Sequence, residues 1–584
     1  MNSRWIRWAG PTVALLALAS SAIGVVNWFT YDDRYIVELN PATRNLHAWW
    51  RAFQTSYWPK DWGGDGYRPL TILAFKIEGA IGGGIPVVHH AVNILLYAAV
   101  SVLVFLLARR ALPSWAAWIT AALFAVHPVH VEAVANVVGQ SELFVAVALI
   151  AATVLYIRDR QAGELRTSTA LGVTALYAIG CFFKEHAIVL PALLASAELT
   201  VIRGTVRRGD RVRQLRPFYL GLVLVALSFM AVRSVVLKDH GLGGFQPFTP
   251  FNTLHISSRD RVLTALGVVP QWARLLFWPA HLSSEYGPPE IEIAQGPSMS
   301  QLPGLMLLIA VVGLGVALRR RHPAMSFGVA FACVTLLPSS NFLLPAGILL
   351  AERTLFLPSV GAMLIVGGAA AWVVESVRMK HRDERRLMLV AQTVLAILLV
   401  LGVARSMLRT RVWRDNDTLF HQAVIDSPRA YRAHYMLGAW DFDHRRRREG
   451  EAEYRRALSL FPYDPYLAYA MAEQYRNASL CGPAIPLYRW AHGLDPDFQL
   501  GHSALAWCLL NEGQYDQARV MAIDAIRVGG DVKVLHRVMF LADSAKAAEL
   551  NPPPPASRSK LEAGKPRANP LNKASRDVRV RPNG

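Results

Sequence analysis

Eleven long apolar stretches constrain the fold of this chain more than any other feature. A helix that crosses a bilayer needs about 20 mostly apolar residues, and a helix satisfies its own backbone hydrogen bonds in lipid. The sequence therefore predicts an all-α, polytopic helical bundle in a membrane. The predicted spans are residues 8–29, 86–107, 114–133, 139–157, 168–183, 186–202, 217–236, 302–318, 323–341, 355–376 and 387–405.

Basic residues between these stretches predict the orientation of the bundle. Short cytoplasmic loops of membrane proteins carry an excess of Lys and Arg. With eleven spans, all the basic clusters fall on one side, which is therefore predicted to be cytoplasmic. The first loop, about residues 30–85, and the chain after residue 405 then lie outside. The clusters occupy residues 4–7, 109–110, 158–166, 203–216, 319–321 and 378–386.

A further apolar stretch, residues 260–279, does not fit this alternation. If it crossed the membrane, the clusters at 319–321 and 378–386 would both move outside. It is also interrupted by Arg261, Pro270 and Arg274. We therefore expect a re-entrant or interfacial amphipathic segment.

The composition agrees with a membrane protein. Of 584 residues, 53% are hydrophobic and 18% are charged, whereas soluble domains average about 45–50% apolar and about 25% charged residues. A net charge of +19 also occurs in nucleic-acid binders, but the basic clusters and a basic tail contain most of it, so no nucleic-acid partner is expected. Arginine greatly outnumbers lysine, as in GC-rich bacterial genomes. We predict a multi-pass protein of the bacterial inner membrane, with its first loop on the periplasmic side.

The four cysteines lie at positions 181, 333, 481 and 508 and form no CxxC pair. The sequence therefore carries no zinc or thioredoxin signature, and no metal site is predicted. Cys481 and Cys508 can pair in an oxidising compartment, but the sequence leaves this open.

A 34-residue period begins after the last predicted span. This is the period of the tetratricopeptide (TPR) repeat, a helix pair that stacks on its neighbours to form a solenoid. Residues 406–549 are therefore predicted to form about three repeats, with 531–549 as a capping helix. A solenoid groove commonly binds a peptide or protein. Positions 34 apart carry matching residues: Gly438, Ala472 and Ala506; Tyr454 and Tyr488; Pro462 and Pro496; Ala457, Ala491 and Ala525.

The chain thus divides into three predicted parts. Residues 1–405 form the transmembrane bundle and residues 406–549 form the solenoid. Residues 550–584 are rich in Lys, Arg and Pro and have no apolar periodicity, so a disordered basic tail is expected.

Ionisable residues beside or within the apolar stretches mark candidate functional positions, because such groups are costly at membrane depth. Asp32 and Asp33 directly follow the first predicted span. Adjacent carboxylates can act as a general base and its electrostatic partner. A helix cap or a solvated loop is the alternative interpretation.

A second group lies where the third and fourth predicted spans meet, at His127, His130, Glu132 and Glu142. These side chains suit a metal or a phosphate, and a polar turn between helices explains them equally well. A phosphate is the better functional interpretation, because no cysteine or clear third metal ligand accompanies the histidines.

Two further groups are Lys184 with Glu185 and Glu352 with Arg353. The cations can meet an anionic group, and Arg is suited to bidentate phosphate recognition. Interfacial salt bridges are the alternative. In the predicted topology all four groups lie on the outer side. They supply carboxylates for proton abstraction and cations for a phosphate leaving group, as transfer from a lipid phosphate to a hydroxyl requires.

Several segments resemble the transmembrane-and-TPR-containing O-mannosyltransferases, which belong to the GT-C superfamily. The resemblance covers about residues 26–360, and the repeats fit it too. The HPVHVEAV…VGQSE and YRPLT motifs are the most specific. The segments are YDDRYIVELNP (31–41), YRPLT (67–71), HHAVNILLY (89–97), LFAVHPVHVEAVANVVGQSEL (123–143), FFKEHAIVLP (182–191) and AERTLFLPSVG (351–361).

This resemblance implies an inverting transfer of mannose, or a related hexose, from a polyprenyl-phosphate sugar to a Ser/Thr hydroxyl of a protein acceptor. The donor is a substrate, and no cofactor is implied. The first outer loop carries the catalytic carboxylate in the GT-C superfamily, and this role maps onto Asp32 or Asp33. Asp32 is preferred, because related enzymes begin the acidic pair with Asp. Candidates for binding the donor phosphate or sugar are His127, His130, Glu132, Glu142, Lys184, Glu185, Glu352, Arg353 and Arg68 of YRPLT.

Three other functions are alternatives to transfer of a sugar to a protein. A GT-C transferase that modifies a lipid or an envelope glycan requires the same site chemistry. A non-catalytic membrane scaffold, with the solenoid as its functional part, leaves the four polar groups unexplained. A transporter is disfavoured, since the sequence lacks paired half-repeats with broken helices. Animal members of the family carry longer repeat arrays than this chain. The resemblance therefore does not imply which protein is the acceptor.

Overall fold

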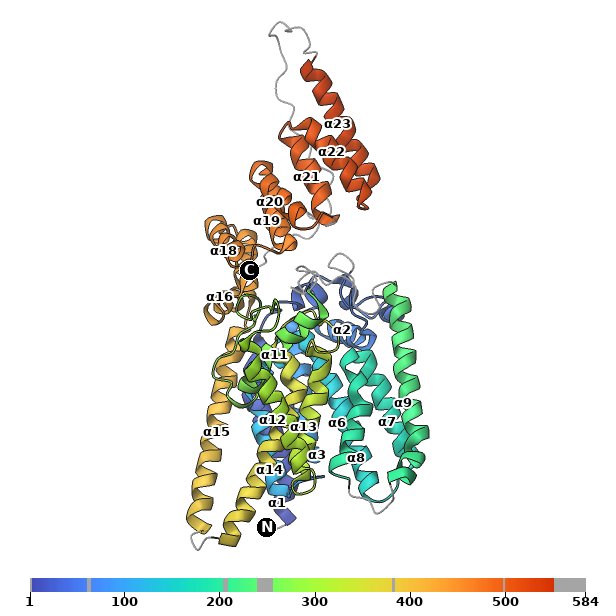
Figure 1. Ribbon diagram of the computed structural model, residues 1–584, viewed down its shortest axis with the longest axis vertical. Helices are drawn as coiled ribbons and strands as arrows, with labels where there is room; N and C mark the ends of the chain where they lie inside the picture. Colours follow the sequence, from blue (N-terminus) through green and yellow to red (C-terminus); the bar gives the residue numbers. More distant parts are fainter. Residues whose placement is uncertain are drawn as a thin grey trace.

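A computed structural model describes residues 3–59, 65–202, 208–238, 256–380, 384–496 and 499–550. These residues contain helices and no β-strand, which confirms the predicted all-α class. Helices α1 to α15 form a bundle, and helices α16 to α23 extend beyond one end of it (Figure 1). Of the predicted tail, residues 550–584, all but the first residue lie outside the described residues.

The bundle confirms a multi-pass architecture. Seven described helices are long and apolar enough to cross a membrane: Ile6–Val26, Pro86–Ala108, Val137–Gln161, Arg213–Leu237, Met299–Leu318, Glu352–Val377 and Arg386–Val412. An eighth span is possible if α4 (Ser114–Ala125) and the segment Pro128–Ala135, which meet at a bend of 48°, cross together. All eight coincide with predicted spans.

The other three predicted spans are shorter helices in the described part of the chain. They are α7 (Thr167–Phe183), α8 (Leu190–Thr200) and α13 (Pro323–Leu336). Helix α8 is short because the preceding residues, Glu185–Val189, form a 3-10 turn, and Pro191 then starts the α-helix. The count of eleven spans stays a prediction.

The remaining bundle helices are α1 (Ser3–Ser21), α2 (Pro69–Gly82), α3 (Pro86–Ala108), α5 (Val131–Ala135), α6 (Gln140–Gln161), α9 (Arg208–Leu237), α11 (Ser258–Phe277), α12 (Leu302–Leu318), α14 (Phe356–Lys380) and α15 (Glu384–Val412). Helix α6 is largely buried. Helices α9 and α15 stand at opposite edges of the bundle in Figure 1 and expose apolar side chains such as Leu224, Leu227, Ile397 and Val400. Lipid is the solvent in which such a surface is stable.

Helix α11 coincides with the stretch 260–279, for which the sequence predicts a re-entrant or interfacial segment. It is 20 residues long, but it is not among the helices apolar enough to span. Its buried residues recur at helical spacing, including Arg261, Ala265, Val268 and Trp272. This amphipathic pattern is typical of an interfacial or re-entrant helix, which stays the prediction.

The C-terminal helical array, residues 416–550, consists of consecutive helices that pack on their neighbours in the chain. They are α16 (Asn416–Asp426), α17 (Tyr431–Asp443), α18 (Arg447–Leu460), α19 (Pro465–Asn477), α20 (Cys481–Leu494), α21 (Gln499–Asn511), α22 (Tyr515–Arg527) and α23 (Val532–Leu550).

The 34-residue period coincides with these helix pairs. Gly438, Ala472 and Ala506 occupy the first helices of successive pairs and are buried. A Cβ at Gly438 would lie 2.8 Å from the Tyr454 ring of the second helix, so a small residue is needed there. A disulfide between Cys481 and Cys508 joins α20 to α21, which answers the pairing question that the sequence left open. Assignment of the array to TPR repeats stays a prediction.

The array and the first loop lie at the same end of the bundle, opposite the start of α1 (Figure 1). The chain after α1 contacts the end of α15 directly. The Trp28 N–H donates to the Arg414 carbonyl at 2.7 Å, and the Asn27 side-chain amide donates to the Thr410 carbonyl at 3.2 Å. The acidic loop that follows is therefore held between the bundle and the array.

Candidate active site

Asp33 connects the acidic loop to the bundle. Its side chain is fully buried, and its carboxylate accepts the backbone N–H groups of Thr30, Val137 and Val138 at 3.2, 3.0 and 2.8 Å. Burial raises the pKa of Asp33 to about 8, whereas the three N–H groups act in the opposite direction. A carboxylate that is enclosed in this way positions the loop and has no open path to a substrate.

The turn that receives Asp33 is itself tightly built. Residues 127–139 follow α4 as two short helical turns and α5. A Cβ at Gly139 would lie 2.2 Å from the Ala133 carbonyl oxygen, so the close backbone approach there needs glycine. The VANVVGQ part of the sequence motif thus builds the pair of N–H groups that bind Asp33.

Asp32 has a different environment. Its side chain is 23% exposed, and its Oδ2 lies 3.8 Å from Nη2 of Arg353. Burial raises the pKa of Asp32, and the positive charges of Arg353 and Arg432 oppose this increase. Of the two adjacent acids, Asp32 is the one that can reach a substrate hydroxyl.

Glu132 holds Arg353 in place. The Arg353 backbone N–H donates to Glu132 Oε2 at 2.9 Å, and its guanidinium Nη1 pairs with Oε1 at 2.5 Å. Glu132 is buried on α5, whereas Arg353 retains an exposed fraction of 18%. Bundle residues distant in sequence thus place one cation beside Asp32.

Glu352, next to Arg353, belongs to a separate buried network. Its Oε1 accepts the Ser283 N–H at 2.6 Å and the Tyr286 hydroxyl at 2.7 Å. The Arg409 guanidinium lies 4.0 Å from the same oxygen. These contacts attach the 278–298 segment to α15. They give the Glu352 carboxylate a structural role.

Arg68 and Glu185 form a second polar cluster. The guanidinium makes a two-pronged contact with the carboxylate, at 3.1 Å from Nε and 2.7 Å from Nη2. Burial raises the pKa of Glu185, but the Arg68 guanidinium, with smaller contributions from His186 and Lys184, holds this pKa well below its usual range. Lys184 and Glu142 form an adjoining buried ion pair, with His186 3.7 Å from Glu142.

Tyr57 lies between the two clusters. The Arg68 guanidinium lies over its ring at 4.6 Å from the centroid. Burial raises the pKa of Tyr57, and the charges of Asp32 and Asp33 are close enough to add to the increase. The YRPLT segment therefore approaches the acidic loop at this ring.

The two motif histidines lie in the core. His130 contacts the Tyr97 hydroxyl at 2.9 Å through Nδ1 and the Ser359 hydroxyl at 2.8 Å through Nε2. His127 contacts the Leu276 carbonyl at 3.1 Å through Nε2 and accepts the Val129 N–H at 3.3 Å. These bonds connect the motif to α3, α11 and α14, and they engage both ring nitrogens of each histidine.

Three residues close to Asp32 were not identified from the sequence. They are Tyr31, Glu285 and Arg432. The Tyr31 hydroxyl donates to Glu285 Oε1, and Arg432 Nη2 lies 3.6 Å from the same oxygen. Tyr31 adjoins the acidic pair, which was an available signal. Glu285 and Arg432 come from distant segments, and no local pattern marks them.

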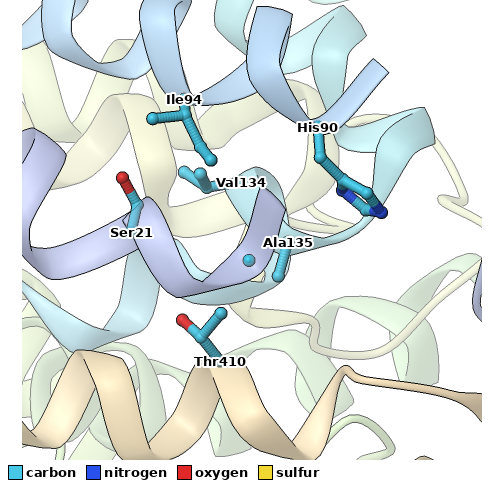
Figure 2. Close-up of a pocket in the computed structure, with 7 residues that line it drawn as sticks. Ser21, His90, Ile94, Val134, Ala135 and Thr410 are labelled. Carbon is cyan, nitrogen blue, oxygen red and sulfur yellow. The ribbon is translucent and has the colours of Figure 1, made fainter. Parts of the chain in front are cut away.

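A small cavity lies among α1, α3, α5 and α15. Its lining residues are Ser21, Gly24, His90, Ile94, Val134, Ala135 and Thr410. Figure 2 shows Val134 and Ala135 of α5 lying between α3 residues on one side and Thr410 of α15 on the other. The space suffices for about one water molecule and is too small for a sugar. Within the described residues, no group of three His, Cys, Asp or Glu side chains is placed to hold a metal ion.

The chain matches known proteins over the bundle. Residues 73–234 match the family model described as dolichyl-phosphate-mannose-protein mannosyltransferase. The chain is 37% identical to the protein O-mannosyl-transferase Tmtc2 of Drosophila melanogaster over 269 residues, which are 44% of this chain and 28% of that protein.

Two longer matches extend into the helical array. Identity is 27% to human protein O-mannosyl-transferase TMTC4, over 74% of this chain and 63% of the relative. It is 25% to mouse protein O-mannosyl-transferase TMTC3, over 86% of this chain and 61% of the relative. The matched part of the chain thus spans between 28% and 63% of the length of these three relatives.

Proposed function

Because this chain is related to the TMTC protein O-mannosyl-transferases, we propose that it is a membrane glycosyltransferase that transfers mannose, or a related hexose, from a polyprenyl-phosphate donor to Ser/Thr hydroxyls of protein acceptors. The observation that carries the proposal is the pair Asp32–Arg353. A partly exposed carboxylate, on the loop that follows the first apolar helix, lies 3.8 Å from a cation in the 3-10 turn Glu352–Leu355.

Asp32 is the proposed general base. It accepts the proton of the Ser/Thr hydroxyl as the hydroxyl oxygen attacks the anomeric carbon of the sugar. The bond between the anomeric carbon and the phosphate oxygen breaks, and the electron pair leaves with the polyprenyl phosphate. Attack opposite the leaving group inverts the anomeric configuration.

Arg353 is the proposed cation for the leaving phosphate. A preorganised charge stabilises the negative charge that develops on the phosphate oxygen, and Glu132 holds the guanidinium toward Asp32. Arg68 with Glu185 and Lys184 with Glu142 are assigned to the donor side of the site. The side chains of His127, His130 and Glu352 form hydrogen bonds with other residues in the protein interior. We therefore propose structural roles for them.

The array is proposed to hold the acceptor protein or peptide. The site is proposed to lie on the outward-facing side of the membrane, which is the periplasmic side of the inner membrane in a bacterial cell. Two arrangements support this placement. The array lies at the same end of the bundle as the first loop (Figure 1), and its cysteines are disulfide-bonded, as is common in oxidising compartments.

The test is a transfer assay with the full chain in lipid nanodiscs. Polyprenyl-phosphate mannose with a radiolabel is the donor, and a Ser/Thr-rich peptide pool is the acceptor. Asp32→Asn is expected to lower the rate by about 100-fold or more, the usual contribution of a general base. Glu290→Gln, an exposed carboxyl on the 278–298 segment, is the matched control and is expected to retain the rate.

The proposal has two separate points of failure. Equal rates for Asp32→Asn and the unmodified chain would remove Asp32 as the base. Labelling of a lipid or glycan with none of the peptide would instead favour the envelope-glycan alternative.

A further inference from the structure

The C-terminal array reaches the residue beside the proposed base. The Tyr31 backbone N–H donates to Asn416 Oδ1 of α16 at 2.7 Å. Arg432 of α17 donates to the Tyr31 hydroxyl, with 3.4 Å between Nη2 and the phenol oxygen. The Tyr31 hydroxyl in turn donates to Glu285. Two helices of the array and one bundle loop thus hold a single residue, α16 through its backbone N–H and α17 and the loop through its hydroxyl.

Tyr31 needs this support because its backbone is strained. Its φ angle is +56°, in the left-handed region that bulky residues rarely adopt. Such conformations persist where the surroundings over-determine them, and they cluster at functional sites. Asp32 directly follows Tyr31, so the direction in which the Asp32 side chain points depends on this turn.

The same arginine adds charge near Asp32. The groups that face Asp32 are the cations Arg353 and Arg432, the anions Glu132 and Glu285, the neighbours Tyr31 and Asp33, and the phenols of Tyr35 and Tyr57. Arg432 is 16% exposed and lies 3.6 Å from Glu285. Its positive charge favours the ionised form of Asp32, the form that a general base requires.

Additional contacts fix the array to the acidic loop. Arg34 lies 3.9 Å from Asp443 and 5.7 Å from the centroid of the Trp440 ring, both on α17. Helix α17 therefore contacts the loop on both sides of Asp32, through Tyr31 and through Arg34.

We infer that Arg432 is a positioning residue of the transfer reaction, through which the helical array fixes the geometry and charge state of Asp32. This inference rests on the proposed function. The array is then an integral part of the active site as well as a candidate holder of the acceptor. Binding of another molecule that displaces α17 would therefore change the rate of transfer without any contact with the sugar donor.

The experiment compares Arg432→Gln and Arg432→Lys with the control Arg429→Gln in the same nanodisc assay. Arg429 is exposed between α16 and α17. Arg432→Gln is expected to lower kcat by about 10- to 100-fold, with a smaller effect on the donor KM, and to move the acid limb of the pH–rate profile to higher pH. Arg432→Lys restores the charge and is expected to return the acid limb toward its original position while recovering only part of kcat. Arg429→Gln is expected to match the unmodified chain.

Several outcomes would overturn the inference. An unchanged kcat and acid limb in Arg432→Gln would do so. A lower kcat with an unshifted acid limb and no recovery in Arg432→Lys would show a purely structural role. If Arg432→Gln does not fold, Tyr31→Phe decides, since it removes only the two contacts of the hydroxyl, to Arg432 and to Glu285; kcat at the original level in that variant would overturn the inference. Absence of mannosyl transfer by the unmodified chain and Arg429→Gln would instead contradict the proposed function.

Discussion

Asp32 Oδ2 lies 3.8 Å from Nη2 of Arg353, whereas the carboxylate of the adjacent Asp33 is bound entirely by backbone N–H groups. Two neighbouring acids therefore have separate tasks. The exposed one faces a cation and the candidate reaction site, and the buried one attaches their loop to the turn at residues 137–138. This division of tasks makes the two positions distinguishable by mutation.

Asp33→Asn is expected to destabilise the protein more than Asp32→Asn. The substitution replaces one acceptor oxygen with an NH2 donor that faces a backbone N–H, and an unsatisfied buried group costs about 1–3 kcal/mol. Thermal unfolding of both variants in detergent at a pH above 8, where Asp33 is ionised, measures the difference. Asp32→Asn should retain the melting temperature and lose activity. The prediction fails if Asp33→Asn unfolds at the same temperature as the unmodified chain.

The pH dependence of transfer should reflect Asp32. Burial raises its pKa despite the nearby arginines, and the base acts only when ionised. The rate should therefore increase with pH through a midpoint above the ordinary Asp value of about 4. Initial rates at saturating donor between pH 4.5 and 8 measure this midpoint. A rate that stays constant down to the lower limit would contradict a raised pKa.

Loss of the Cys481–Cys508 disulfide should destabilise the array. The bond joins residues 27 positions apart, and closing a loop of that length contributes about 3–4 kcal/mol in the chain-entropy model. Cys481→Ser with Cys508→Ser should lower the unfolding temperature of the full chain. Cys333→Ser in α13 is the control, because Cys333 forms no disulfide. Equal melting of the double variant and the control would argue against a stabilising bond.

Much of the fold could be predicted from local sequence pattern. The apolar stretches coincide with helices, and Ala457, Ala491 and Ala525, which are 34 positions apart, are all buried at corresponding places. Length was the less predictable property. The stretch at 186–202 contains only an 11-residue α-helix, because a 3-10 turn, Glu185–Val189, takes up its first residues.

The candidate site was predictable only in part. Asp32, Asp33 and Arg353 were identified by their polarity beside apolar stretches, but so were His127 and His130, which serve the core. A histidine beside an apolar helix looks the same in sequence whether its ring faces a substrate or Ser359. Burial and bond partners distinguish the two cases.

The sequence by itself determined the helical membrane architecture, the repeat period and the acidic pair, because these depend on composition and periodicity over short distances. Only the tertiary structure decided which aspartate is accessible, which cation it faces, and that Arg432, 401 positions from Tyr31, belongs beside it. Such pairs depend on how distant helices pack, and local patterns carry no information about that packing.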